Sequence, residues 1–260
     1  SSLRYKKLCI FTDQDLDGHH IAGLIINFVQ HMFPSVLQLI PDFIIKFSTP
    51  IVKVTCPNKT VVSFDSEAEF SEWQRTAPGW PNRYGVKYYK GLGTSTTTEA
   101  KEYFRGWSER VHPLIRVDDV DDDRLDMAFN EKRAGDRKQW LSGYNPFDPP
   151  VLQYDDRGCA PISRFIDTEL IAFSNKDNCR SIPSVIDGLK VVQRKVLYAA
   201  FKRNIQKGMR VSTMAGVVTE EAVYHHGEAS LHEAIVKLAQ DYVGTNNMNW
   251  LVPDGQFGCR

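Results

Sequence analysis

The chain has 260 residues, of which 42% are hydrophobic and 25% are charged, and this composition excludes a disordered or fibrous protein. Its length leaves room for two domains. The 32 basic and 32 acidic residues balance, so the overall charge indicates no acidic partner. No apolar run approaches about 18 residues, and we therefore expect no membrane-spanning helix and no membrane partner.

Charge is nevertheless concentrated in two segments. Residues 187–210 carry seven basic residues against the single acid Asp187, and residues 118–126 carry six aspartates and one arginine. A basic block in a neutral chain is typical of local contact with a polyanion. The five cysteines lack the spacing of metal ligands and indicate reduced thiols in an intracellular protein.

The first part of the chain has the pattern of an α/β domain. Residues 6–12 form an apolar run that predicts a buried strand, and the apolar spacing between Gly18 and Pro34 predicts a helix directly after it. Further elements are expected as strands at 49–56 and 59–66, a helix at 66–76 with Ser66 as its N-cap, and a strand, glycine turn and helix within 84–107.

The composition changes after this α/β pattern. Residues 110–162 contain the aspartate run and several prolines, and we expect a connector with helical segments, mainly within 123–141.

The last part of the chain is predicted to be helical. From Ser163 the apolar spacing is that of helices, and the segment 185–201 carries basic residues opposite its apolar face. Two more helices, at 211–224 and 230–244, precede a tail at 247–258 whose composition predicts a β-hairpin or wing. Three helices with a basic member and a wing indicate a helix-turn-helix variant.

Three aspartates, Asp13, Asp15 and Asp17, occupy alternate positions directly after the first strand. Carboxylates this close resist joint ionisation unless a cation offsets them, and their oxygens suit Mg²⁺. An EF-hand calcium loop is excluded, because its twelfth position would be Leu24 instead of glutamate. A solvated Asp/Gly-rich turn remains the alternative to a metal site.

Two other segments could contact phosphate groups. Lys90 precedes a Gly-x-Gly turn, where an ammonium and backbone N–H groups can face an anion, although most such turns are only turns. The segment 224–228, "YHHGE", lies between two predicted helices; it is either a hydrogen-bonded turn or a donor to phosphate oxygens.

Six motifs, taken together in order and spacing, resemble the DNA cleavage core of eukaryotic-type DNA topoisomerase II, a type IIA topoisomerase. They are "DQDLDGHHIAGLIINF", "KYYKGLGTSTTTEAKEYF", "DRKQWL", "SIPSVIDGLKVVQRKVLYAAFKRN", "YHHGEASL" and "GQFGCR". The resemblance departs from the family at Val191-Val192, where the family usually has Pro-Gly or Pro-x, and at Cys259, where threonine is usual.

The resemblance implies an order of domains and a set of site residues. It implies an α/β Toprim domain at 1–109 with a parallel sheet, a connector at 110–162 and a mainly α winged-helix domain at 163–260. Asp13 and Asp15 would bind Mg²⁺ directly, with Asp17 as a nearby carboxylate. The residues implied to contact the DNA backbone are Lys90, Arg137, Lys138, Lys190, Arg194, Lys195, Tyr224, His226 and Ser230.

The resemblance also implies a reaction. The family cleaves both strands of duplex DNA transiently through a 5′-phosphotyrosyl link, passes a second duplex and religates the break. We expect the nucleophilic tyrosine after Arg260, a further metal-binding glutamate before Ser1, and ATP bound outside this span. A homodimer in the nucleus is implied. The alternative is a DNA-binding or scaffold protein that keeps both modules without cleaving DNA.

Overall fold

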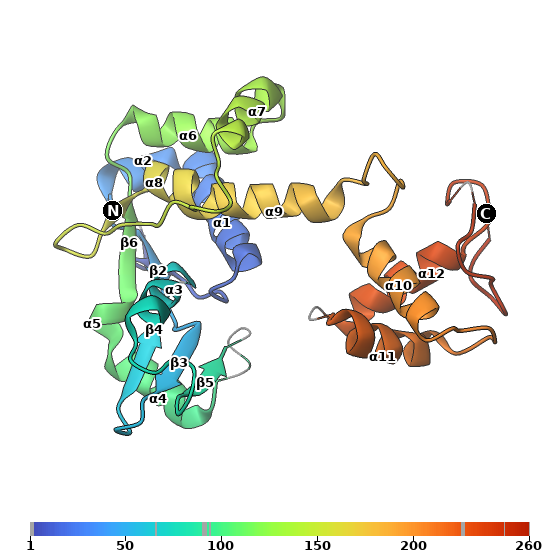
Figure 1. Ribbon diagram of the computed structural model, residues 1–260. Coiled ribbons are helices and arrows are strands. Elements are labelled where there is room, and N and C mark those ends of the chain that lie inside the picture. Colours follow the sequence, from blue (N-terminus) through green and yellow to red (C-terminus); the bar gives the residue numbers. More distant parts are fainter. Residues whose placement is uncertain are drawn as a thin grey trace. The chain divides into compact units, whose positions relative to one another are not determined.

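A computed structural model of the protein describes residues 3–65, 67–89, 93, 95–224, 227–246 and 248–259, with only the backbone of residues 67 and 68. The chain forms two compact units, residues 1–176 and residues 177–260 (Figure 1). Each unit has its own hydrophobic core.

The main sheet of the first unit has four strands in the order β1-β2-β6-β7. These strands are β1 (Leu8–Ile10), β2 (Ile44–Phe47), β6 (Val111–Ile115) and β7 (Ala160–Pro161). β2 is parallel to β1 and antiparallel to β6, and β6 is parallel to β7. The predicted strand at 6–12 is confirmed as β1, although only Ile10 of its residues is buried, whereas β2 was not predicted.

Helices cover this sheet and complete the core. They are α1 (Leu16–Met32), α2 (Pro34–Leu39), α6 (Asp119–Phe129), α7 (Ala134–Ser142) and α8 (Ile162–Phe165), with a 3₁₀ turn η2 (Glu131–Arg133) and a π-helical segment η3 (Ile166–Leu170). The predicted helix between Gly18 and Pro34 is confirmed as α1. Its buried residues, which include Ala22, Ile26 and Val29, recur at the spacing of one helix face. Most of the larger apolar residues of the pattern, among them Leu24 and Phe28, are exposed, so the pattern predicts the helix but not its buried face.

A second, smaller sheet belongs to the same unit. Its strands are antiparallel in the order β4 (Val61–Phe64), β3 (Val52–Thr55) and β5 (Gly85–Tyr88), and the helices that follow in this region are α3 (Glu67–Thr76), α4 (Thr97–Arg105) and α5 (Trp107–Arg110). Phe64, Phe70 and Trp73 pack together over this sheet. The predicted strands and helices of 49–107 are confirmed, while the proposed N-cap Ser66 lies outside the described residues.

Residues 110–162 form part of the first unit. β6 pairs with β2 inside the main sheet, and Leu114 is fully buried. The aspartate run is structural at Asp121, which is buried and whose carboxylate accepts backbone hydrogen bonds from Val117 and Ser163, both at 2.6 Å. The unit therefore extends to about Lys176. The boundaries 1–109, 110–162 and 163–260 of the named modules stay a prediction.

The second unit is helical in the part that the structure describes. α9 (Ile171–Ser181) runs across the division between the units, and α10 (Val191–Lys202), α11 (Val211–Ala222) and α12 (Glu228–Ala239) follow. α10, α11 and α12 pack around Val196, Val218 and Leu231, which are almost fully buried.

The predicted β-hairpin or wing is wrong for the residues described between 240 and 259, which contain no strand. The tail pairs with the end of α12 instead of with itself. The backbone N–H groups of Trp250 and Leu251 both donate to the carbonyl of Leu238, at 2.8 and 3.2 Å. Gln240 also donates to the carbonyl of Phe257 at 3.0 Å, so the hydrogen bonds a hairpin would need are used elsewhere.

Within the described parts of the chain, no helix has both the length and the apolar content needed to cross a membrane.

Candidate functional site

The acidic loop, defined as residues 11–17, follows the carboxyl end of β1 and includes the first two residues of α1. Asp15 is the N-cap of α1, and its Oδ1 accepts a hydrogen bond of 2.7 Å from the backbone N–H of Gly18. Gln14 Nε2 donates to the carbonyl of Phe47 at 3.0 Å and attaches the loop to the end of β2. Ligands of open α/β sheets bind at this end of the strands, so the loop lies where a site is expected.

The three aspartates of the loop differ in exposure. Asp15 is exposed, whereas Asp13 and Asp17 are half-buried, and Asp17 lies in the first turn of α1. Carboxylates at a helix N-terminus interact favourably with the helix dipole, so Asp15 and Asp17 also stabilise α1. Among the residues that the structure describes, no three His, Cys, Asp or Glu side chains converge to hold a metal ion.

The donor set of the loop nevertheless fits an open Mg²⁺ site. Mg²⁺ prefers oxygen ligands and is usually held by one or two carboxylates, with water and phosphate oxygens completing its octahedron. Asp13 and Asp15 can supply those carboxylates without a closed cage of three protein ligands. Their assignment as ligands, with Asp17 as a nearby charge, stays a prediction.

The path of the loop depends on Gly18. A Cβ added there would lie 2.0 Å from the carbonyl oxygen of Asp13 and 3.2 Å from Oδ1 of Asp15. A side chain therefore cannot be added at Gly18 unless the loop moves.

A buried ion pair joins β2 to η3. Lys46 on β2 is 1% exposed, and its ammonium donates to the Glu169 carboxylate on η3. Burial alone would raise the pKa of Glu169, but the adjacent Lys46 ammonium holds that pKa below its ordinary value. His19 Nε2 lies 3.8 Å from Glu169 Oε2, and burial lowers the pKa of His19 to about 4, so His19 is neutral at pH 7.

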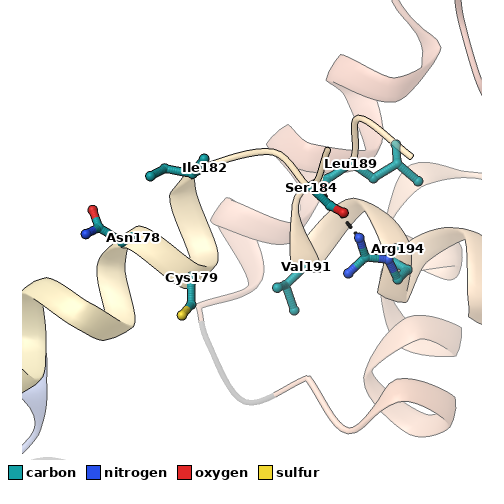
Figure 2. Close-up of a pocket in the computed structure, with 7 residues that line it drawn as sticks. All are labelled: Asn178, Cys179, Ile182, Ser184, Leu189, Val191 and Arg194. Carbon is teal, nitrogen blue, oxygen red and sulfur yellow. Dashed lines mark hydrogen bonds between the residues drawn. The ribbon is translucent and has the colours of Figure 1, made fainter. Parts of the chain in front are cut away.

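In the second unit, Arg194 on α10 is exposed but already has a partner. Its Nε and Nη2 donate to the two carboxylate oxygens of Asp187, both at 2.9 Å. This pair raises the pKa of Arg194 and lowers that of Asp187. Figure 2 shows Arg194 turned toward Ser184 at the edge of a shallow pocket of about 310 Å³, which Ile182 and Leu189 also line.

The other residues predicted in this unit lie near the beginning of α10 and the end of α11. Lys190 is the exposed N-cap of α10, and Lys195 Nζ donates to the carbonyl of Val223 at 3.2 Å. Tyr224 is 5% exposed and belongs to the core, where burial raises its pKa. Ser230 is exposed in the first turn of α12.

Arg137 and Lys138 lie on α7 of the first unit and differ in their exposure to solvent. Arg137 Nη1 donates to the carbonyls of Met127, at 3.0 Å, and Asn130, so it satisfies the carboxyl end of α6. Lys138 is exposed on the next position of α7. The structure thus gives Arg137 a role in holding α6 and α7 together, in addition to any contact with a phosphate.

Two predicted site residues, Lys90 and His226, lie outside the described residues. Three residues that the sequence reasoning missed are Asp187, the partner of Arg194, and the pair Lys46 and Glu169. Lys46 is the single charged residue of the apolar stretch "FIIKF", which could have indicated a buried partner for it.

Two protein families match the chain in succession. The C-terminal associated domain of TOPRIM matches residues 47–178, and the A-type subunit of DNA gyrase/topoisomerase IV matches residues 180–260. The DNA topoisomerase 2 of Candida albicans is 48% identical over the whole chain, and that of Arabidopsis thaliana is 46% identical. The chain spans 17–18% of the length of these two relatives.

A solved structure also matches. It is the DNA-binding, cleavage and re-ligation domain of Plasmodium falciparum topoisomerase II, with a TM-score of 0.75 and 42% identity over 99% of this chain and 34% of that one. The expected fold class, a Toprim α/β domain followed by a mainly helical domain, is thereby confirmed. The chain belongs to the type II DNA topoisomerase family, and it contains the C-terminal associated domain of TOPRIM.

The close approach at Gly18 predicts that a single added methyl group there lowers the stability of the protein. Gly18→Ala should lower the free energy of unfolding by about 1–3 kcal/mol, because the added Cβ would displace the Asp13 carbonyl. Urea unfolding followed by circular dichroism measures this change. Gly135→Ala on α7 is the matched control, since a Cβ there meets no atom within 4 Å and alanine favours the helix. Equal stability of the two variants would contradict the close approach.

Proposed function

We propose that the chain is part of the DNA cleavage and religation core of a type IIA DNA topoisomerase. Such an enzyme changes DNA topology by Mg²⁺-dependent transient cleavage of both strands, passage of a second duplex and religation. The observation that carries the proposal is the acidic loop, whose exposed Asp15 carboxylate follows the carboxyl end of strand β1. The likeness to a topoisomerase II cleavage domain supports it.

Asp13 and Asp15 would hold Mg²⁺, and Asp17 would add negative charge beside them. When bound, Mg²⁺ supplies charge that polarises the scissile phosphate and stabilises the leaving 3′ oxygen. The acidic loop orients the two carboxylates through the cap at Gly18 and the bond from Gln14 to β2.

The cationic residues would bind and orient the DNA backbone. Lys190, Arg194 and Lys195 occupy the N-cap and first turns of α10, where side-chain cations and backbone N–H groups can both face phosphate oxygens. Tyr224 and Ser230 would support the same contact, and the exposed Lys138 with Arg137 would bind from the first unit. Lys90 and His226 belong to the same proposal.

The whole protein would need groups that residues 1–260 do not supply. We assign the nucleophilic tyrosine to a segment after Arg260 and the ATP site to another part of the protein. A double-strand break by one tyrosine per subunit requires two subunits, so a homodimer on duplex DNA is the assembly we propose. The named relatives are eukaryotic proteins, and we place this one in the nucleus.

Removing the charge of the loop without removing the helix cap tests the metal assignment. Asp13→Asn and Asp15→Asn, made in the full-length protein, should abolish Mg²⁺-dependent cleavage and leave salt-sensitive DNA binding intact. Asparagine caps helices as well as aspartate, so the substitution at Asp15 changes mainly its charge.

The control for this experiment is another capping aspartate of the same unit. Asp118 caps α6 and accepts from the backbone N–H of Val120 at 2.9 Å, so Asp118→Asn should leave cleavage unchanged. A plasmid cleavage assay compares the three variants. Undiminished cleavage by Asp13→Asn and Asp15→Asn would remove the loop from the site.

Replacement of Arg194 tests the proposed backbone contact. Arg194→Ala should weaken duplex binding similarly for all DNA sequences. It should also reduce the slope of the logarithm of the binding constant against the logarithm of the salt concentration by about the contribution of one phosphate contact. Arg203→Ala is the control, because Arg203, the C-cap of α10, is paired with Glu220 and Glu221 of α11. Fluorescence anisotropy at several salt concentrations gives both quantities. A loss confined to one DNA sequence would contradict a phosphate contact.

A further inference from the structure

We propose that Glu99 on α4 is a positioning residue, which fixes both ends of the segment 90–95 so that Lys90 can bind a DNA phosphate at a smaller entropic cost. The inference rests on the proposed contact between Lys90 and the DNA backbone. Lys90 lies outside the described residues, whereas the residues at the two ends of its segment, Tyr89 and Ser95, are described.

The segment begins after Tyr89, which is fixed by its backbone and by its side chain. The N–H group of Tyr89 donates to the carbonyl of Ile51 at 2.9 Å and thus continues the pairing of β5 with β3. Its hydroxyl donates to Oε1 of Glu99. The centre of its ring also lies 4.7 Å from Lys87 Nζ and 5.9 Å from Lys53 Nζ. Tyr89 thereby links the end of β5 to the first turn of α4.

At the other end of the segment, Ser95 and Thr96 are attached to the same helix. The N–H group of Thr96, the N-cap of α4, donates to Oε2 of Glu99 at 2.7 Å, and the N–H group of Glu99 donates to Thr96 Oγ1 at 3.3 Å. The hydroxyls of Ser95 and Tyr103 form a hydrogen bond of 3.2 Å, and Tyr103 is buried. The two carboxylate oxygens of Glu99 therefore bind opposite ends of the segment.

The charge of Glu99 strengthens these bonds. Lys87 Nζ donates to both of its carboxylate oxygens, at 2.7 and 2.9 Å. Burial alone would raise the pKa of Glu99, but the hydrogen bonds from Lys87, Thr96 and Tyr89 hold that pKa below its ordinary value, so Glu99 is ionised at pH 7. Hydrogen bonds to an ionised carboxylate are stronger than those between neutral groups. Lys87 also compensates the charge of Glu99, which limits the repulsion between this carboxylate and a phosphate bound by Lys90.

A helix cap alone does not account for this arrangement. A capping box requires only the reciprocal bonds between Thr96 and Glu99. The bond from Tyr89 crosses from the strand to the helix and closes the segment between them. Glycine loses more conformational freedom on ordering than any other residue, and the segment contains Gly91 and Gly93. Holding its ends together lowers the entropy that is lost when Lys90 binds a phosphate.

A double-mutant cycle in the full-length protein tests this role. Tyr89→Phe removes the bond to Oε1 but keeps the ring, and Glu99→Gln removes the charge but keeps a side chain that can form the capping box. Each should weaken duplex binding about three- to tenfold in the wild type, and by less than about 1.5-fold in a Lys90→Ala variant. Fluorescence anisotropy measures these affinities. A general loss of stability would act equally in both backgrounds.

A matched control lies on the same helix. Glu102 binds Lys53 across the same boundary between α4 and the smaller sheet, at 3.2 Å, but has no printed bond to either end of the segment, so Glu102→Gln should leave duplex binding unchanged. Equal weakening by Glu102→Gln would contradict a specific role of Glu99.

Two further outcomes separate the possible failures. If Lys90→Ala binds duplex DNA as tightly as the wild type, the proposed phosphate contact of Lys90 is wrong, and this inference fails with it. If Lys90→Ala weakens binding but Tyr89→Phe and Glu99→Gln do not, or if they weaken it equally in both backgrounds, only the role of Glu99 is wrong.

Discussion

The conformation of the acidic loop depends on one close backbone contact, between the Asp13 carbonyl and Gly18 at the start of α1. This contact and the cap by Asp15 turn the chain from β1 into a helix within a few residues. Three carboxylates are thereby held near a helix N-terminus, whose dipole offsets part of their repulsion. A divalent cation would offset the rest and could then take a phosphate oxygen as a further ligand, which links the local geometry to the proposed chemistry.

The positive charge of α10 is not spread along the whole helix, as its sequence suggests. The basic residues of α10 appear as one block, but acids of α11 neutralise its carboxyl end, where Lys202 and Arg203 pair with Glu220 and Glu221. The beginning of α10 carries Lys190, which is exposed, and Arg194, whose partner Asp187 is itself at the surface. Positive charge is therefore concentrated at the beginning of this helix, where its N–H groups also favour anions. Exposed ion pairs of this kind contribute little stability, so a phosphate can replace Asp187 at small cost.

Much of the fold could be predicted because periodic apolar residues indicate the helices α1 and α10 and the strands of the smaller sheet. The buried face of α1 was not predicted, because Leu24 and Phe28 of the apolar pattern are exposed. β2 was missed because its buried Lys46 interrupts the apolar pattern, and only the distant Glu169 explains how a lysine can be buried there. β6 was missed because Pro113 and the aspartate run indicate a loop, whereas the pairing with β2 is a tertiary contact. The composition of the tail predicted a hairpin, but its backbone bonds to the end of α12.

For the candidate site, the sequence identified the aspartates and basic residues but not their partners. Asp187 and Glu169 become partners of Arg194 and Lys46 only when the chain folds.

The most direct test of this account is anomalous diffraction from crystals of the chain with Mn²⁺ and duplex DNA. The account predicts an ion about 2.1 Å from carboxylate oxygens of Asp13 and Asp15, with a DNA phosphate oxygen also in its coordination sphere. Crystals in which DNA is bound, the loop faces away from it and no ion lies at these aspartates would contradict the central claim.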